Sequence, residues 1–167
     1  MMHHGRFHRA LVKVLSALCA VLFAALVLDV LWGVFTRQVL NDQPAWTDEL
    51  ARFLLVWLAL LGGVLAYADD RHLGVDVLVS RLDPAAQRIA LLVSHLGVFG
   101  FSLAVLVAGG VELFVSRWEA GQMMSALDIR KAWFYLVLPL AGSLITLMAG
   151  GKVIRSLKSF GERGEAR

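Results

Sequence analysis

An apolar run without a single charged residue, Phe53–Ala68, constrains this chain more than any other feature. Together with the residues just before it, the run approaches the ~20 residues that a helix needs to cross the ~30 Å hydrocarbon core of a membrane. Asp48 and Glu49 fall at its start, where negative charge stabilises the first turn of a helix. Thr47 is predicted to be the N-cap, because its hydroxyl can accept from the free backbone N–H groups there. The run is therefore predicted to be a membrane-spanning helix with an acidic entrance.

Three more apolar runs have similar lengths, and 59% of the 167 residues are hydrophobic while only 17% are charged. This composition is typical of a protein that crosses a bilayer several times. The first run follows a basic head as in a signal peptide, but it exceeds the usual ~7–15 apolar residues, so we interpret it as a retained span. The sequence predicts an all-α membrane protein, with residues 1–167 as a single membrane domain. Its four transmembrane helices are expected at about 14–36, 48–68, 88–115 and 132–154.

The linker between the second and third predicted spans shows helical periodicity. Val75, Leu78, Val79 and Leu82 follow the i, i+3, i+4, i+7 spacing that places apolar side chains on one helical face. Valines at alternate positions also fit a strand, but a lone strand would leave its edge groups unpaired. We therefore predict a short amphipathic helix in the membrane interface at about residues 73–82.

The distribution of lysine and arginine predicts an orientation. Eleven of the sixteen lie in the N-terminal head, the linker after the second span and the C-terminal tail, whereas five lie in or beside the other two connections. Positively charged residues stay on the cytoplasmic side of a membrane, so both termini are expected in the cytoplasm, an N-in/C-in arrangement. Trp46, Trp118 and Trp133 would then form an aromatic belt at the outer interface.

Charged side chains at the start of the second span are the first candidate site. Asp48 and Arg52 are spaced i,i+4, and Glu49 and Arg52 are spaced i,i+3. One arginine can therefore neutralise two carboxylates on one helix face. We predict a structural ion-pair group of these three residues that extends to Arg37 and to Asp29 or Glu112.

Asp29 and Glu112 are carboxylates inside apolar runs. A charge at the centre of a membrane helix costs ~2.5–3.5 kcal/mol on insertion scales, so such a residue usually has a partner or faces water. One interpretation is a cation or proton site. The other, which we favour, is a structural role in which the carboxylates reach the outer interface or pair with an arginine. The arginines considered for this pairing are Arg37, Arg52 and Arg117.

The histidine and cysteine residues give no support for a cofactor or a metal. His95 stands alone in the third run, whereas a b-type haem in a membrane needs two axial ligands. His72 lies near several aspartates of the linker, Asp76 among them, but without a compact ligand spacing, so a hydrogen-bonding role is predicted. The single Cys19 cannot form an internal disulfide. No motif of an enzyme active site is present, and the basic residues flank apolar runs instead of forming a nucleic-acid-binding stripe.

Glycines are predicted to let three of the spans pack closely, because small residues allow helices to approach one another in lipid. Glycine is also generally commoner in membrane helices, which is the alternative explanation. The positions are Gly62, Gly63, Gly97, Gly100, Gly109, Gly110, Gly150 and Gly151.

Several short motifs follow one another in order across the chain. They are Thr36-Arg37 with Val39-Leu40-Asn41, the run from Trp46 to Arg52 (WTDELAR), Trp57, Gly62, the run from His72 to Asp76 (HLGVD), and Tyr135 with Pro139. This series resembles the small membrane subunit of TRAP (tripartite ATP-independent periplasmic) transporters, the DctQ type. One departure is that the usual Glu-Glu pair is Asp48-Glu49 here, which keeps the charge but shortens the reach by one methylene.

The resemblance implies a four-helix subunit of the bacterial inner membrane, in contact with membrane lipids, with no transport pathway of its own. It implies binding to a large permease subunit that carries substrate and sodium, while a periplasmic solute-binding protein delivers an organic acid. The sequence agrees, because it contains no inverted repeat or discontinuous helix pair of the kind that builds a transport site. The implied ion-pair and subunit-interface residues are Arg37, Trp46, Asp48, Glu49, Arg52, Trp57, His72 and Asp76.

Two functions of other classes also fit the sequence. A self-contained small exporter would use Asp29 or Glu112 for proton coupling and would transport its substrate when reconstituted alone. A membrane anchor subunit of a respiratory complex would bind haem or quinone, and a haem anchor would show a Soret band.

Overall fold

The computed structural model describes residues 3–69 and 83–164, and within this part the chain is almost entirely helical. The predicted interfacial helix at about 73–82, with the candidate residues His72 and Asp76, lies outside the described residues. Helix α1 (His3–Phe35) continues as the π-helix η1 (Thr36–Leu40) and is followed by α2 (Ala45–Ala68). Helix α4 (Pro84–Phe101) continues as the π-helix η2 (Ser102–Gly109) and then as α5 (Gly110–Glu119). The last helices are α6 (Ala132–Tyr135) and α7 (Val137–Gly164).

Four stretches of this architecture are long and apolar enough to cross a membrane, at Arg9–Leu40, Ala45–Ala68, Ile89–Glu119 and Ala132–Ile154. They correspond to the four predicted spans, so the expectation of four transmembrane helices is confirmed by length and composition. The first and third stretches extend a few residues beyond the predicted limits, because helix α1 continues through η1 and α5 continues to Glu119.

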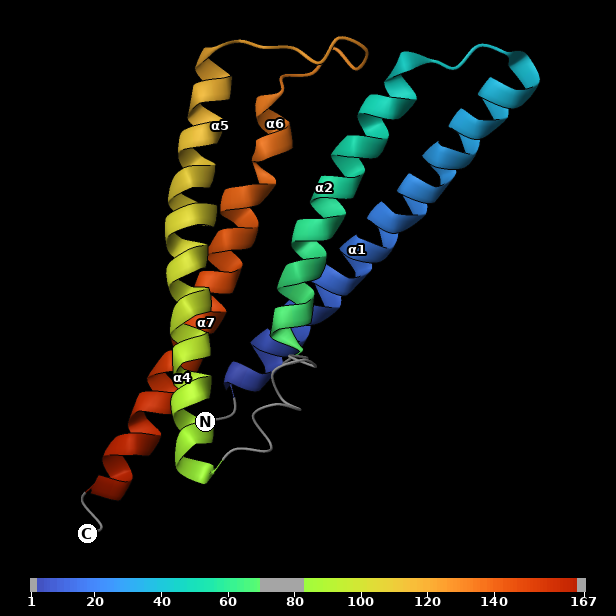
Figure 1. Cartoon of the computed structure of the whole chain (residues 1–167). Coiled ribbons are helices and arrows are strands. Elements are labelled where there is room, and N and C mark those ends of the chain that lie inside the picture. Colours follow the sequence, from blue (N-terminus) through green and yellow to red (C-terminus); the bar gives the residue numbers. More distant parts are fainter. Residues whose placement is uncertain (1–2, 70–82, 165–167) are drawn as a thin grey trace.

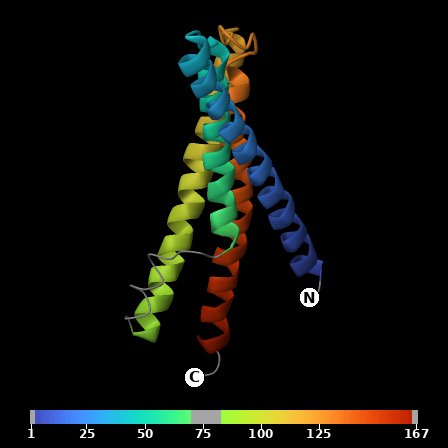
Figure 2. The ribbon, with the colours of Figure 1, turned by 90° about the vertical axis from the view of Figure 1, so that its right-hand side faces the viewer.

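The helices form two antiparallel hairpins (Figure 1). One consists of α1 and α2, the other of α4–η2–α5 packed against α6 and α7, and α2 packs on α7 to join them. We call the end of the bundle that carries the 41–44 and 120–131 connections the loop end, and the opposite end, where α1 begins and α7 finishes, the terminal end. Helices α1 and α4 diverge from the centre on opposite sides toward the terminal end (Figure 2).

The buried core is small and sits where α2 meets α7. Val64 and Ala141 are fully buried there, together with Leu15 of α1. In contrast, large apolar side chains of α1 and of the α4–η2–α5 helix are exposed along most of their length, for example Val21, Leu28 and Val93. Such faces are too apolar for water and suit contact with lipid or with another membrane protein.

Close helix packing occurs where η2 and α5 cross α7. A Cβ atom on Gly142 would lie 2.6 Å from the Cβ of Leu106, and one on Gly110 would lie 2.9 Å from the Cβ of Leu138. The glycine-packing prediction is thus confirmed for Gly110. It missed Gly142, which has no second glycine beside it.

Other predicted packing glycines show no such contact within the described part of the chain. A Cβ on Gly150 would meet the ring of Phe99 at 3.4 Å, an ordinary approach. Positions with no atom within 4 Å of that Cβ are Gly62, Gly63, Gly97, Gly100 and Gly151. These glycines do not serve packing inside the described part of this subunit.

The third span contains a wide π-helical segment, η2, that begins at a buried serine. The hydroxyls of Ser102 and Thr146 lie 2.9 Å apart and form a hydrogen bond between η2 and α7. The Ser102 hydroxyl is also 3.1 Å from the carbonyl of Phe99 and can donate to it. A hydroxyl that bonds to an earlier carbonyl often disturbs the helix around it.

The fourth span is interrupted at Leu136, between α6 and α7. Pro139 accounts for the interruption, because a proline has no N–H for the carbonyl four residues earlier and its ring would clash with that carbonyl. Here that residue is Tyr135, the last residue of α6. The proline predicted inside the span is therefore accommodated by a local break.

The predicted N-cap role of Thr47 is wrong. Helix α2 begins at Ala45, with Pro44 in the N-cap position and no side-chain cap. The Thr47 hydroxyl instead donates to the carbonyl of Pro44 at 2.8 Å. The sequence argument looked for a side-chain cap, whereas the extended backbone of Pro44 (φ −63°, ψ 130°) already leads directly into the helix.

Candidate functional site

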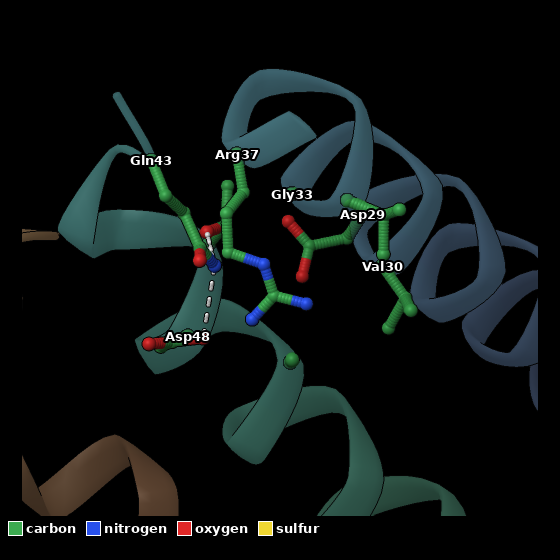
Figure 3. A pocket seen from close by; sticks show the side chains of 9 residues that line it. Asp29, Val30, Gly33, Arg37, Gln43 and Asp48 are labelled. Carbon is green, nitrogen blue, oxygen red and sulfur yellow. Dashed lines mark hydrogen bonds between the residues drawn. The ribbon is translucent and has the colours of Figure 1, made fainter. Parts of the chain in front are cut away.

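Asp29 lies in a cavity between α1 and α2 near the loop end (Figure 3). The cavity has a volume of about 170 Å³ and is lined by Asp29, Val30, Gly33, Val34, Arg37, Gln43, Thr47, Asp48 and Ala51. Only 6% of the Asp29 surface is exposed. Among the described residues, neither of its carboxylate oxygens has a hydrogen-bond partner. The carboxylate of Asp29 is thus buried in the protein and faces this cavity.

Arg37 belongs to η1 and lines the same cavity. In Figure 3 its guanidinium points toward the Asp29 carboxylate. Helical side chains lean toward the N-terminus of their helix, so Arg37 leans back over Gly33 toward Asp29. Gly33 lines the same cavity and allows the start of α2 to approach α1 closely. A Cβ there would lie 3.3 Å from Nε2 of Gln43 and 3.4 Å from Oγ1 of Thr47.

Gln43 links the 41–44 connection to the start of α2. Its amide Nε2 lies 3.2 Å from Oγ1 of Thr47 and 3.2 Å from Oδ1 of Asp48, and donates to both. The Asp48 carboxylate therefore has a partner on its own helix entrance. Neither Gln43 nor Gly33 was singled out from the sequence, because neither residue type signals a role without a known neighbour.

Glu49 connects the two hairpins at the loop end. Its Oε2 accepts from the backbone N–H of Ala126 at 3.0 Å and of Leu127 at 3.2 Å. These residues belong to the 120–131 connection, which is ordered by its own backbone bonds, such as Met124 N–H to the Ile129 carbonyl at 2.8 Å. A carboxylate that accepts two backbone N–H groups makes a charge-assisted and therefore strong contact.

The contacts found for Asp48 and Glu49 are hydrogen bonds, to Gln43 and to the 120–131 backbone respectively. The ion-pair group predicted around Arg52 stays a prediction. Arg52 and Trp46 are both exposed at the loop end of α2. The structure therefore leaves these two side chains accessible to other molecules.

Aromatic side chains line the contact between α2 and α6. Trp57 and Phe53 have ring centroids 5.4 Å apart, and Phe53 lies edge-on to Phe134 at 6.2 Å. The indole Nε1 of Trp57 is buried and has no hydrogen-bond partner among the described residues. The ring of Trp57 thus packs within the chain, while its N–H donor has no acceptor among the described residues.

A second aromatic group surrounds the end of α5. Trp118 lies edge-on to Trp133 at 6.4 Å, and the guanidinium of Arg130 sits 4.5 Å from the Trp118 ring centroid. Trp46 lies in the first turn of α2 at the same end of the bundle. The three tryptophans predicted to form a belt are therefore all at the loop end.

The two intramembrane carboxylates are not brought together. Glu112 is exposed in the first turn of α5, in the second hairpin, whereas Asp29 is buried in the first. Within the described residues, no three His, Cys, Asp or Glu side chains gather closely enough to hold a metal ion.

A contact at the terminal end was not foreseen from the sequence. Nζ of Lys152 in α7 donates to the carbonyl of Tyr67 at 3.0 Å and lies 4.0 Å from the centroid of the Tyr67 ring. Tyr67 is in the last turn of α2, where unpaired carbonyls carry partial negative charge and attract a cation. Lys152 thus ties α7 to the end of α2.

The chain matches the family described as tripartite ATP-independent periplasmic transporters, DctQ component, over residues 26–159. The match begins in the last third of α1 and ends within α7, so it covers the end of the first span and the whole of the other three. The chain belongs to the DctQ family. The resemblance noted in the sequence is thereby confirmed, and DctQ proteins are components of transporters and not enzymes.

Individual DctQ relatives agree with this assignment. A TRAP transporter small permease protein of Haemophilus influenzae is 39% identical over 77 residues, which cover 46% of this chain and 48% of that protein. The sialic acid TRAP transporter small permease protein SiaQ of Vibrio cholerae is 28% identical over 141 residues, covering 82% of this chain and 78% of SiaQ.

A longer relative also matches. The isethionate TRAP transporter permease protein DctMQ of Oleidesulfovibrio alaskensis is 26% identical over 102 residues, covering 61% of this chain but only 16% of that protein. The chain thus spans about half the length of the Haemophilus relative and a small part of DctMQ. Family membership and four apolar spanning helices together make this DctQ protein a multi-pass protein of the bacterial inner membrane.

Proposed function

We propose that this chain is the small permease subunit of a TRAP transporter and acts as an accessory subunit without a transport path of its own. The observation that carries the proposal is the family match over residues 26–159, which includes the end of the first spanning helix and all of the other three. The chemistry of the chain is compatible with this role, since its one buried intramembrane carboxylate in the described residues faces a small cavity near the loop end and not a path through the bundle.

The proposed partner is a large permease subunit that carries the substrate. The relative DctMQ supports this idea, because this chain matches only 16% of it and the rest is available for a larger permease part. The exposed apolar faces of α1 and of α4–η2–α5 offer extensive surface for such a partner. At the loop end, Arg37, Trp46, Asp48 and Arg52 are exposed and available to contact it.

The other proposed interface residues have partners within the chain or lie outside the described part. Glu49 binds the 120–131 connection and Trp57 packs on Phe53. We assign Glu49 a role in shaping the loop end that the partner meets, and Trp57, in the middle of α2, a role in packing within the bundle. His72 and Asp76 keep their proposed interface role on the strength of the family motif alone.

The proposed transport reaction is sodium-coupled uptake of an organic acid that a periplasmic solute-binding protein delivers. Relatives named for sialic acid, C4-dicarboxylates and isethionate support an organic anion as the substrate class. The solute itself would be selected by the other components.

The proposed orientation places both termini in the cytoplasm and the loop end in the periplasm, because the predicted cytoplasmic segments hold eleven of the sixteen lysines and arginines. A reporter enzyme that is active only in the periplasm should be active when fused after Gln122 and silent when fused after Asp83. The reverse pattern would contradict the proposed topology.

Association with the large subunit can be tested by purification. The full chain, carrying an affinity tag, is expressed with the candidate large permease encoded beside its gene and extracted in mild detergent. We expect a stable one-to-one complex by native mass spectrometry. An unrelated multi-pass protein with the same tag should recover no permease. Recovery of this chain alone, with the large subunit present in the extract, would refute the proposed partnership.

A further inference from the structure

Asp29 is the polar group whose surroundings leave most to be explained. Its carboxylate is more than nine-tenths buried and faces a cavity of about 170 Å³, with no hydrogen-bond partner for either oxygen among the described residues. Buried polar atoms in folded proteins nearly always have a partner, from protein or from ordered water. A charged one without a partner is especially costly in a span that crosses lipid.

The residues that line the cavity supply polar groups that can bind water next to Asp29. Arg37 supplies a guanidinium with five N–H donors, and Thr47 and Asp48 supply further polar atoms on the α2 side. The volume is well above the ~10–15 Å³ that one water molecule needs, and a water also needs two to four polar neighbours. The cavity satisfies both conditions.

We propose that ordered water bound in this cavity bridges the carboxylate of Asp29 to the guanidinium of Arg37 and to Asp48. Arg37 is then the counter-ion of Asp29 across water, and the bridged charges hold the loop end of α1 against the entrance of α2. Gly33 also lines the cavity, and its missing side chain lets Gln43 and Thr47 approach α1 closely there.

The proposed arrangement predicts an asymmetry between the two charges. Removal of Arg37 leaves a buried carboxylate with no counter-ion, whereas removal of the charge of Asp29 leaves an arginine that is exposed and can be solvated. Arg37→Gln should therefore be the more harmful change. Adding Asp29→Asn to Arg37→Gln should recover part of the lost stability, because the unpaired charge is then gone.

The test is the midpoint of thermal unfolding of the full chain in lipid nanodiscs. We expect a clear decrease for Arg37→Gln, a smaller one for Asp29→Asn, and a midpoint for the double variant above that of Arg37→Gln. Lys131→Gln and Asp42→Asn remove exposed charges at the same end of the bundle and should leave the midpoint unchanged. An unchanged midpoint in Arg37→Gln, or no recovery in the double variant, would overturn the proposal.

Two further measurements compare the unmodified chain with Asp29→Asn. They test whether Asp29 is protonated and whether the cavity binds a metal cation. Infrared spectroscopy should show no protonated-carboxyl band that is lost in Asp29→Asn, since such a band would mean a neutral Asp29 with no need of a counter-ion. Exchange of sodium chloride for choline chloride should not change the midpoint. A sodium-dependent midpoint that disappears in Asp29→Asn would instead assign a bound metal cation and overturn the water bridge.

Discussion

Glu49 shows how one side chain serves two elements at once. It lies in the second turn of α2, just after Asp48 of the first turn. Its Oε2 also accepts from the backbone of Ala126 and Leu127, 77 and 78 residues further along the chain. The carboxylate therefore fixes the 120–131 connection of the second hairpin to the first.

Glu49→Ala should loosen that connection. Hydrogen bonds to a charged group contribute roughly 1.5–3 kcal/mol, and 1.4 kcal/mol corresponds to a factor of about ten, so amide exchange at Ala126 and Leu127 should accelerate by about tenfold or more. Glu49→Gln keeps an acceptor oxygen, so its exchange rates at these two amides should lie between those of the unmodified chain and those of Glu49→Ala.

The matched control is Glu119→Ala, which removes an exposed carboxylate beside the same connection. It should leave exchange at these two amides as in the unmodified chain. Equal exchange in Glu49→Ala and the control would show that Glu49 does not hold the connection.

At this scale the sequence singled out candidate residues but did not predict the partners that the structure gives them. Asp48 and Glu49 were identified from their position at the entrance of an apolar run. Their partners, Gln43 and the backbone of the 120–131 connection, were not, because spacing along one helix reports only neighbours on that helix. Asp29 was identified as a carboxylate inside an apolar run, but the cavity around it requires a second helix.

Among the elements, η2 and α5 approach α7 closely where they cross it. Gly142 and Gly110 allow it, since a Cβ at either position would lie within 3.0 Å of a neighbouring side-chain atom. The hydroxyls of Ser102 and Thr146 form a hydrogen bond that joins η2 to α7. The second hairpin is therefore held by packing and by a polar contact within the span.

Gly142→Ala should destabilise the second hairpin. The added methyl group would overlap the side chain and backbone of η2 around Leu106, and overpacking of this kind typically costs about 1–3 kcal/mol. Gly63→Ala is the control, because a Cβ there meets no atom within 4 Å. Thermal unfolding in detergent should show a lower midpoint only for Gly142→Ala. Equal midpoints would mean that the crossing can adjust without cost.

Hydropathy was enough to predict four spans, because length and apolar content alone decide whether a helix can cross a bilayer. It could not predict the two π-helical segments or the break before α7 in detail. Those depend on where a hydroxyl or a proline meets a particular carbonyl, as Ser102 does with Phe99 and Pro139 with Tyr135. The Thr47 prediction failed for a similar local reason at Pro44.

In the whole molecule, the exposed large apolar side chains lie mainly on the first and third spans. The buried apolar cluster lies where α2, α7 and α1 meet, while α1 and the third span expose large apolar side chains along most of their length. The sequence predicted the membrane location from composition. It could not say which faces would be left without a neighbour, since that depends on how the hairpins pack.

Uptake of a radiolabelled organic acid into proteoliposomes is the most direct test of the proposed accessory role. The vesicles contain this chain, the large permease subunit, or both, with the periplasmic solute-binding protein added outside under an inward sodium gradient. We predict uptake only when all three proteins and the gradient are present. Uptake catalysed by this chain alone, or uptake that is undiminished when this chain is left out, would contradict the proposal.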